Sequence, residues 1–326
     1  MPARRERSAK QLFKARRPST ISNVQEQSST TSIMAQEIRQ CCVTGHIHQG
    51  TARGTVTQVA GLNTYISAPP NGSKDKTILF ITDIFGYEFP VLLPFFNSID
   101  LRMLGSLPMS MPLRASTSIF PTCSTVEFLA DNSRLTMLGD AVPSHVLSQI
   151  LPTKQQEAAK TAAEKSSDEA AGGAELGAWL GRQREEVVYP LMTNFLEHIR
   201  TDSSHKKVGA VGFCWGGRYA VLFTREGVSP FVDAAVAMHP SFLKIPEEIE
   251  NVTKPVLIQV GDADAIMGAP DIQKTQEIFK GKSDCEIVVY PDQVHGFSVR
   301  GDLSVESDRK AKEKAAEKVG PRFKHC

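Results

Sequence analysis

A cysteine stands in a tight glycine turn: residues 212–217 read GFCWGG and directly follow the apolar run 208–211. A buried strand that ends in Gly-x-Cys-x-Gly and continues into helix-forming residues is the pattern of a nucleophile elbow, with sulfur where serine is more usual. The glycines allow the residue between them to occupy a strained turn. Cys214 is therefore a candidate nucleophile, and the rest of the chain must supply a base.

Two polar residues further along the chain are candidates for that base and for an acid that orients it. A free thiol is mostly protonated at neutral pH, and a neighbouring imidazole that accepts its proton increases the reactive thiolate. His295, in VHGF, is the candidate base, and Asp264, in GDADAIM, is the carboxylate that fixes its tautomer. The order nucleophile, acid, histidine is that of the α/β-hydrolase triad, and the reaction it favours is acyl transfer. The alternative is three unrelated structural roles: an inert buried thiol, a turn-capping aspartate and a core histidine.

Short apolar runs that alternate with helical patterns predict the elements that position these residues. A hairpin is expected at 55–59 and 62–67, followed by buried strands at 77–82, 207–212, 232–238, 256–260 and 285–290. Helices are expected at 154–200, long or broken, and at 218–223, 272–279 and 307–318. The fold class is therefore α/β, with a mostly parallel sheet and helices on both faces.

Open α/β sheets carry their chemistry at the carboxyl ends of the strands. The polar residues at these predicted ends are Asp83, Cys214, His239, Asp262 or Asp264, and His295. The backbone N–H of Trp215, at the start of the helix after the turn, is a candidate donor to the oxyanion of an acyl-transfer intermediate.

Several further motifs surround these residues: Cys41-Cys42 through GLNTY at 61–65, DIFG at 83–86, GFCWGGRYA at 212–220, HPSF at 239–242, GDADAIM at 261–267 and VHGFSVRGD at 294–302. Together they resemble the dienelactone hydrolase (carboxymethylenebutenolidase) family, in particular its fungal members. The resemblance covers about 40–90 and 139–305 and implies an α/β-hydrolase fold. It also implies a Cys214, Asp264 and His295 triad. Because a thiol nucleophile suits an activated ester, we expect a small ester or lactone substrate, and we expect no cofactor.

The same resemblance implies roles for Asp83 and Arg300. The family places a carboxylate that contacts the thiol at the position of Asp83, where its members often carry the longer Glu. Arg300 matches an arginine that pairs with a carboxylate of the substrate, a task that suits a bidentate guanidinium. A charged surface residue is the alternative interpretation of Arg300.

Residues 91–138 depart from the family pattern. They are rich in Ser, Met, Leu and Pro and show no sustained period of 3.6 or 2. We expect this region to be irregular, to lack the strand that the family places beside 78–82, and thus to expose a sheet edge there. Our hypothesis is an altered reading frame or a retained intron, which a transcript that encodes these residues in a folded, active protein would refute.

The N-terminal residues differ in charge from the remainder. Residues 1–33 carry seven basic and two acidic side chains, whereas the whole chain of 326 residues has a net charge of +1. Two interpretations of this extension stay open: a mitochondrial transit peptide and a disordered basic tail. We expect one α/β-hydrolase domain over 34–326, in the cytoplasm or, if the extension is a transit peptide, in the mitochondrion.

The composition of the chain argues against several classes of binding partner. The charge balance favours no nucleic acid, and the sequence has no apolar run of the roughly 18 residues that predict a membrane span. Six cysteines without a Cys-x-x-Cys pair indicate a reducing compartment. Cys41 and Cys42 with His46 and His48 are spaced too tightly for four tetrahedral ligands, so no metal is expected. The oligomeric state, monomer or dimer, stays open.

The sequence leaves two rival functions open. The first is a serine-type carboxylesterase or lipase of the same fold, which a thiol reagent would leave active. The second is a non-catalytic α/β-hydrolase-like binding protein. A nucleotide-binding domain is disfavoured because residues 212–217 lack the third glycine at its required spacing.

Overall fold

One mixed sheet forms the centre of the molecule. The computed structural model of the chain describes residues 55–67, 74–83, 125–129, 180–181 and 183–323. The strands are β1 (Thr55–Val59), β2 (Leu62–Ser67), β3 (Lys76–Ile81), β4 (Thr125–Leu129), β5 (Lys207–Phe213), β6 (Ala234–Met238), β7 (Val256–Gly261) and β8 (Cys285–Tyr290). They lie in the order β1-β2-β4-β3-β5-β6-β7-β8. β1, β2 and β4 pair antiparallel, whereas β4, β3, β5, β6, β7 and β8 run parallel.

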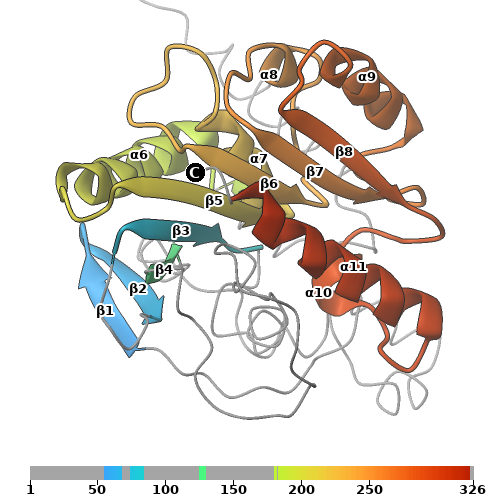
Figure 1. Cartoon of the computed structure of the whole chain (residues 1–326), viewed down its shortest axis with the longest axis horizontal. Coiled ribbons are helices and arrows are strands. Elements are labelled where there is room, and N and C mark those ends of the chain that lie inside the picture. Colours follow the sequence, from blue (N-terminus) through green and yellow to red (C-terminus); the bar gives the residue numbers. More distant parts are fainter. Residues whose placement is uncertain (1–54, 68–73, 84–124, 130–179, 182, 324–326) are drawn as a thin grey trace, which may run out of the picture.

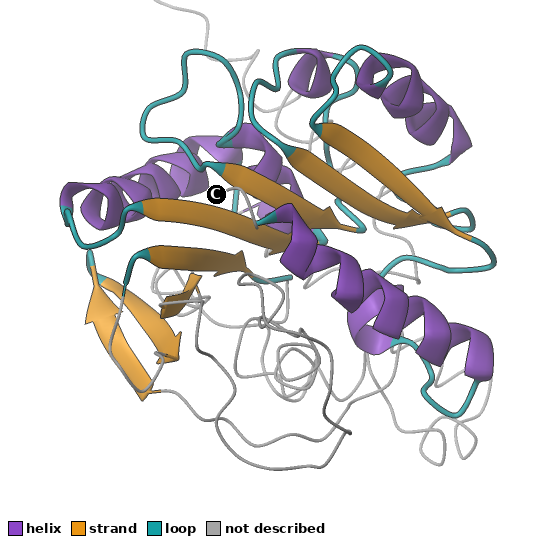
Figure 2. Cartoon of the chain, in the orientation of Figure 1, coloured by secondary structure: helices purple, strands orange, loops and turns teal. Residues whose placement is uncertain are grey.

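Helices cover both faces of the sheet, as Figures 1 and 2 show. They are α6 (Glu185–Thr201), α7 (Trp215–Leu222), α8 (Glu247–Glu250), α9 (Ala269–Phe279), α10 (Phe297–Arg300) and α11 (Glu306–Arg322). Apolar residues of α6, α7, α8 and α9 pack on one face, and those of α10 and α11 pack on the other. Every residue of β6 is buried, because a strand covered on both faces has no solvent side. The predicted α/β class is confirmed.

The predicted strands agree closely with the sheet. β1, β2 and β8 have the expected bounds, and β3, β5, β6 and β7 differ from them by one or two residues. α9 and α11 begin earlier than expected, and α6 is the described part of the expected helix at 154–200. The inferences about residues 1–33, and about the cysteines and histidines at 41–48, lie outside the described residues.

The expectation for residues 91–138 is wrong at one place. Residues 125–129 form β4, which pairs parallel with β3 and antiparallel with β2. β3 is therefore an interior strand and not the exposed edge that the composition predicts. The remainder of 91–138 lies outside the described residues.

A buried ion network joins three helices behind the glycine turn. Arg218 of α7 donates from Nε to both carboxylate oxygens of Glu248 on α8, at 3.2 and 3.0 Å. It also donates from Nη2 to Glu185 at the start of α6, at 2.6 Å. Burial opposes the charge of Arg218, but both carboxylates raise the pKa of its guanidinium above the ordinary value. These bonds fix α7 relative to its neighbours because a buried charge must keep its partners.

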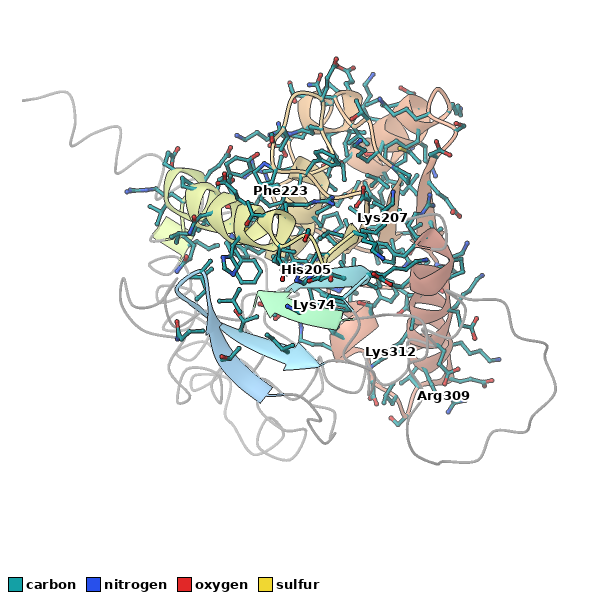
Figure 3. All side chains as sticks on the ribbon, turned by 60° about the vertical axis from the view of Figure 1, so that its left-hand side comes forward. Lys74, His205, Lys207, Phe223, Arg309 and Lys312 are labelled. Carbon is teal, nitrogen blue, oxygen red and sulfur yellow. The ribbon has the colours of Figure 1, made fainter. Side chains whose placement is uncertain are left out.

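One buried histidine, His205, lies far from the glycine turn. Nδ1 of His205, labelled in Figure 3, lies 2.6 Å from Oγ1 of Thr77. Burial lowers its pKa, and the contact joins the amino ends of β3 and β5. His205 is therefore at the end of the sheet opposite to the one where the site is expected.

Candidate active site

Cys214 occupies a strained backbone conformation between β5 and α7. Its φ is 51° and its ψ is −116°, a region that residues with a Cβ rarely adopt. Neighbouring hydrogen bonds hold the turn: the N–H of Cys214 donates to the carbonyl of Met238 at 3.0 Å, and its own carbonyl accepts from Gly217 at 3.0 Å. This is the geometry of a nucleophile elbow, as the sequence predicts.

The turn also requires a glycine at 216. A Cβ there would lie 2.3 Å from the carbonyl oxygen of Ile81 and 2.4 Å from that of Thr82. Both are backbone atoms at the end of β3, so they cannot move aside cheaply. Only glycine lets α7 start this close to β3.

We predict that Gly216→Ala separates α7 from β3 and displaces Cys214. Overpacking of a tight core costs about 1–3 kcal/mol of unfolding free energy, and catalytic activity should fall further because the elbow moves. Urea unfolding and an ester assay measure the two effects. Gly281→Ala is the control, since its Cβ would meet its nearest neighbour, the carbonyl of Ile278, at an ordinary 3.6 Å. Equal behaviour of the two variants would contradict this account.

His295 and Asp264 form a fully buried pair. Nδ1 of His295 lies 2.9 Å from Oδ2 of Asp264 and 3.1 Å from Oδ1. The carboxylate also accepts the N–H groups of Ile266 at 2.8 Å and Met267 at 3.2 Å, which fix its orientation. The choice between the two aspartates is thereby resolved, because Asp262 is exposed and its Oδ1 instead accepts the N–H of Asp292 at 2.7 Å.

Two loops at the carboxyl ends of β7 and β8 bring this pair together. The N–H of Ala263 donates to the carbonyl of Gln293 at 3.1 Å. A Cβ on Gly261 would lie 1.8 Å from the same carbonyl oxygen, so the loop after β8 approaches the end of β7 as closely as a glycine allows. The approach sets Asp264 beside His295.

A serine joins the cysteine to the histidine. Oγ of Ser241 lies 3.3 Å from Sγ of Cys214 and 3.3 Å from Nε2 of His295. The thiol of Cys214 also forms a hydrogen bond with His295 directly, so three side chains from the ends of β5, β6 and β8 meet next to Asp264. The sulfur, the imidazole and the carboxylate do meet at one rim of the sheet.

The charges at the site favour an ion pair. Burial raises the pKa of the Cys214 thiol, but interaction with His295 outweighs it and leaves that pKa below the ordinary value. Burial likewise lowers the pKa of His295, but interaction with Cys214 and Asp264 raises it well above the ordinary value. Thiolate and imidazolium thus stabilise each other.

Asp83 and Arg300 pair with each other. Nη1 of Arg300 donates to Oδ2 of Asp83 at 2.5 Å, and both side chains are buried. The charge of Arg300 lowers the pKa of Cys214, while the charge of Asp83 raises it. The expected pairing of Arg300 with a carboxylate of the substrate stays a prediction. The alternative of a charged surface residue is wrong, since Arg300 is 3% exposed.

His239 lies against His295 without sharing its chemistry. The two rings meet edge to face, with centroids 5.1 Å apart, and Nε2 of His239 lies 2.9 Å from Oγ of Ser298. Burial, together with the charges of His295 and Arg300, lowers the pKa of His239 well below its ordinary value. His239 is therefore a neutral wall of the site and not a second base.

Trp215 begins α7 immediately after Cys214. Its indole packs against Tyr219 with ring centroids 4.8 Å apart. The place of its backbone N–H, at the start of a helix and next to the sulfur, is the one that an oxyanion donor needs. That role stays a prediction.

The model of the dienelactone hydrolase family matches residues 153–326, more than half of the chain and all the residues from Cys214 to His295. The chain belongs to the dienelactone hydrolase family. It is a hydrolase of the carboxylic ester class, and its sheet and helices are those of an α/β hydrolase.

Several known proteins are similar to this chain over most of their length. The hydrolase pyvD of Aspergillus violaceofuscus is 25% identical over 285 residues, which cover 85% of this chain and 91% of that protein. The hydrolase tropI of Talaromyces stipitatus is 26% identical, with 82% and 87% covered. The carboxymethylenebutenolidase homolog of Xenopus tropicalis is 23% identical, with 85% and 92% covered.

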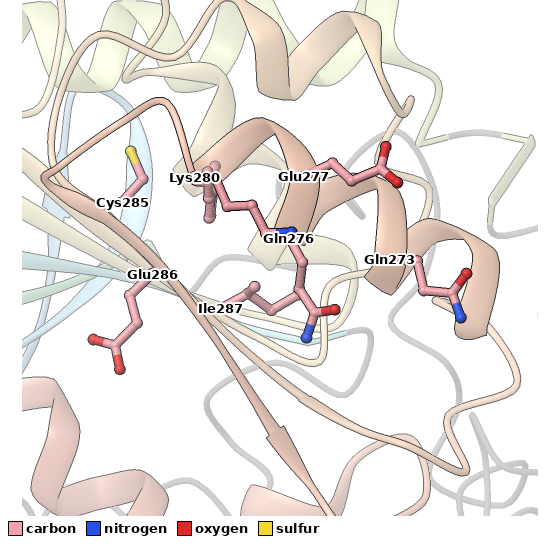
Figure 4. Close-up of a pocket in the computed structure, with 8 residues that line it drawn as sticks. Gln273, Gln276, Glu277, Lys280, Cys285, Glu286 and Ile287 are labelled. Carbon is pink, nitrogen blue, oxygen red and sulfur yellow. The ribbon is translucent and has the colours of Figure 1, made fainter.

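An open groove of about 550 Å³ lies elsewhere, between α9 and β8 (Figure 4). Its lining includes Gln276 of α9 together with Cys285 and Ile287 of β8. Cys285 begins β8, so the groove lies toward the amino end of that strand, away from Cys214. Burial raises the pKa of the Cys285 thiol, which makes it a poor nucleophile.

Metal-ligating side chains do not gather elsewhere in the described ranges. Among those residues, no group of three or more His, Cys, Asp or Glu side chains has the geometry to hold a metal ion. None of the helices described is long and apolar enough to cross a membrane.

Proposed function

We propose that this hydrolase cleaves an activated ester or an enol lactone through a Cys214, His295 and Asp264 triad and a thioester intermediate. The observation that carries the proposal is the strained backbone of Cys214, at φ 51°, beside a buried His295 and Asp264 pair. A strained nucleophile next to an oriented base is the arrangement that acyl transfer needs.

The proposed reaction starts from the thiolate of Cys214 and the imidazolium of His295. The thiolate of Cys214 attacks the ester carbonyl, a C–S bond forms, and the carbonyl electrons move to oxygen beside the N–H of Trp215. Collapse expels the alkoxide or enolate, which takes the proton of His295. A water then gives its proton to His295 and attacks the thioester carbonyl, and the C–S bond breaks to release the acid and the thiolate.

The leaving group sets the substrate class. An enol lactone expels a stabilised enolate, so a sulfur ester forms readily, whereas an amide needs stronger acid assistance. We therefore propose lactone or ester hydrolysis and not proteolysis. The names of the relatives, such as carboxymethylenebutenolidase homolog, support this class.

The test uses two reagents and one mass measurement. Iodoacetamide should abolish hydrolysis of p-nitrophenyl acetate and of an enol lactone, while a serine reagent should not. Acid quenching during turnover should trap the acyl group on the peptide that contains Cys214. An acyl group on a serine would favour the serine-type esterase. Absence of turnover with the fold intact by circular dichroism would favour a binding protein.

A further inference from the structure

The Ser241 hydroxyl stands at the centre of the candidate site. Ser241 is 1% exposed and lies in the loop that follows β6. Its oxygen is 3.3 Å from Sγ of Cys214 and 3.3 Å from Nε2 of His295. The nucleophile and the base thus share one buried hydroxyl.

The main chain fixes this hydroxyl relative to the sulfur. The N–H of Ser241 donates to the carbonyl of Cys214 at 2.9 Å, so Ser241 is tied to the elbow itself. The loop turns sharply before it, since His239 has a φ of 39°. Ser241 therefore moves with Cys214 and not with a separate surface loop.

A hydroxyl suits both protonation states of its neighbours. It has one proton to donate and two lone pairs that accept. When the pair is charged, the hydroxyl accepts from the imidazolium Nε2–H and donates to the thiolate. When the pair is neutral, it accepts from the thiol and donates to the imidazole.

We propose that Ser241 bridges Cys214 and His295 as a positioning residue, and that its hydroxyl stabilises the ion pair that forms when the thiol proton passes to His295. The S–H bond breaks as its proton moves to Nε2, while the hydroxyl of Ser241 keeps its own proton and donates it in a hydrogen bond to the thiolate. The hydroxyl ends with one proton, the sulfur gains the negative charge and the imidazole gains the positive one. The inference rests on the proposed function of Cys214 and His295.

Ser241→Ala tests the bridge by the pH dependence of alkylation. The rate of iodoacetamide reaction at Cys214, followed by peptide mass spectrometry, reports the thiolate and needs no turnover. A hydrogen bond to a charged group corresponds to a change of about ten- to hundredfold in an equilibrium. The midpoint of alkylation should therefore rise by about 1–2 pH units, and kcat/KM on p-nitrophenyl acetate at neutral pH should fall by about ten- to hundredfold.

Two variants separate the bridge from a merely structural role. Ser298→Ala is the matched control, because it removes a buried hydroxyl that contacts the neutral His239 instead of the ion pair, and its alkylation midpoint should stay at the wild-type value. Ser241→Thr keeps the hydroxyl and should restore the midpoint. If Ser241→Ala does not fold, Ser241→Gly removes the same oxygen.

The outcomes distinguish this inference from the proposed function. An unchanged alkylation midpoint in Ser241→Ala, with Cys214→Ala inactive, overturns the bridge and leaves the cysteine mechanism. A raised midpoint in a protein whose turnover does not depend on Cys214 supports the bridge and overturns the mechanism. Loss of all activity in Ser241→Ala, with Cys214→Ala still active, makes Ser241 the nucleophile and overturns both.

Discussion

Cys214→Ala is expected to lower kcat/KM on p-nitrophenyl acetate by about 10³-fold or more, because the variant lacks the sulfur on which we propose that the acyl-enzyme forms. The remaining rate should come from the oxyanion donor and from binding of the ester. The fold should be retained, although the smaller side chain keeps the strained φ of 51°. The measurement is steady-state hydrolysis by the purified variant, with circular dichroism as the check on folding.

Cys285→Ala is the matched control for this loss. Cys285 is a free thiol in the described part of the chain, and burial raises its pKa. Its replacement should leave hydrolysis and sensitivity to iodoacetamide unchanged. A fully active Cys214→Ala protein would remove the cysteine mechanism, whatever the behaviour of Cys285→Ala.

The parallel strands can be predicted from the sequence because they are covered on both faces. A strand buried on both sides must be a continuous apolar run, which is why the apolar run at 285–290 has the bounds of β8. Helix α7 is harder to predict, since it begins at Trp215 and not at the expected 218. Gly216 and Gly217 are poor helix formers, but Gly216 is required by close packing against the end of β3 and Gly217 lies close to Pro240.

Strand β4, in contrast, could not be predicted from the sequence. Its five residues, TVEFL, lie in a stretch whose composition predicts no regular element. Strand formation there depends on pairing with β2 and β3, and such distant pairing leaves no local signal. α8 and α10 have four residues each, too few for a helical period.

The three residues of the proposed triad can be found in the sequence because each of them follows an apolar run. Ser241 stands in the HPSF motif, but it lies two residues beyond His239, the polar residue at the end of its strand, and the sequence does not mark it as part of the site. The turn at His239, with φ 39°, brings the chain back to the elbow, and sequence alone does not specify that turn. The hydrogen bond between Asp83 and Arg300 cannot be predicted from the sequence either, since the two residues are far apart along the chain.

Asp264→Asn is expected to lower kcat by about 10³- to 10⁴-fold while leaving the fold intact, since the loss of a triad carboxylate has effects of this size. The amide can donate to Nδ1 of His295 and so favour the wrong tautomer. It also removes the negative charge that helps to raise the pKa of His295.

The pH profile of kcat/KM should become narrower in Asp264→Asn. The acid limb reports the thiol of Cys214, whose pKa the imidazolium lowers, and the basic limb reports the imidazolium, whose pKa is raised. Without the carboxylate, the pKa of the His295 imidazolium falls, so the basic limb should move to lower pH. The less stable imidazolium also stabilises the thiolate less, so the pKa of Cys214 rises and the acid limb should move to higher pH. Asp262→Asn is the control, because this exposed residue on the same loop contacts Asp292 and not His295. A profile of wild-type width in Asp264→Asn would show that the carboxylate does not stabilise the ion pair, and His295 would then lack the partner on which its role as base depends.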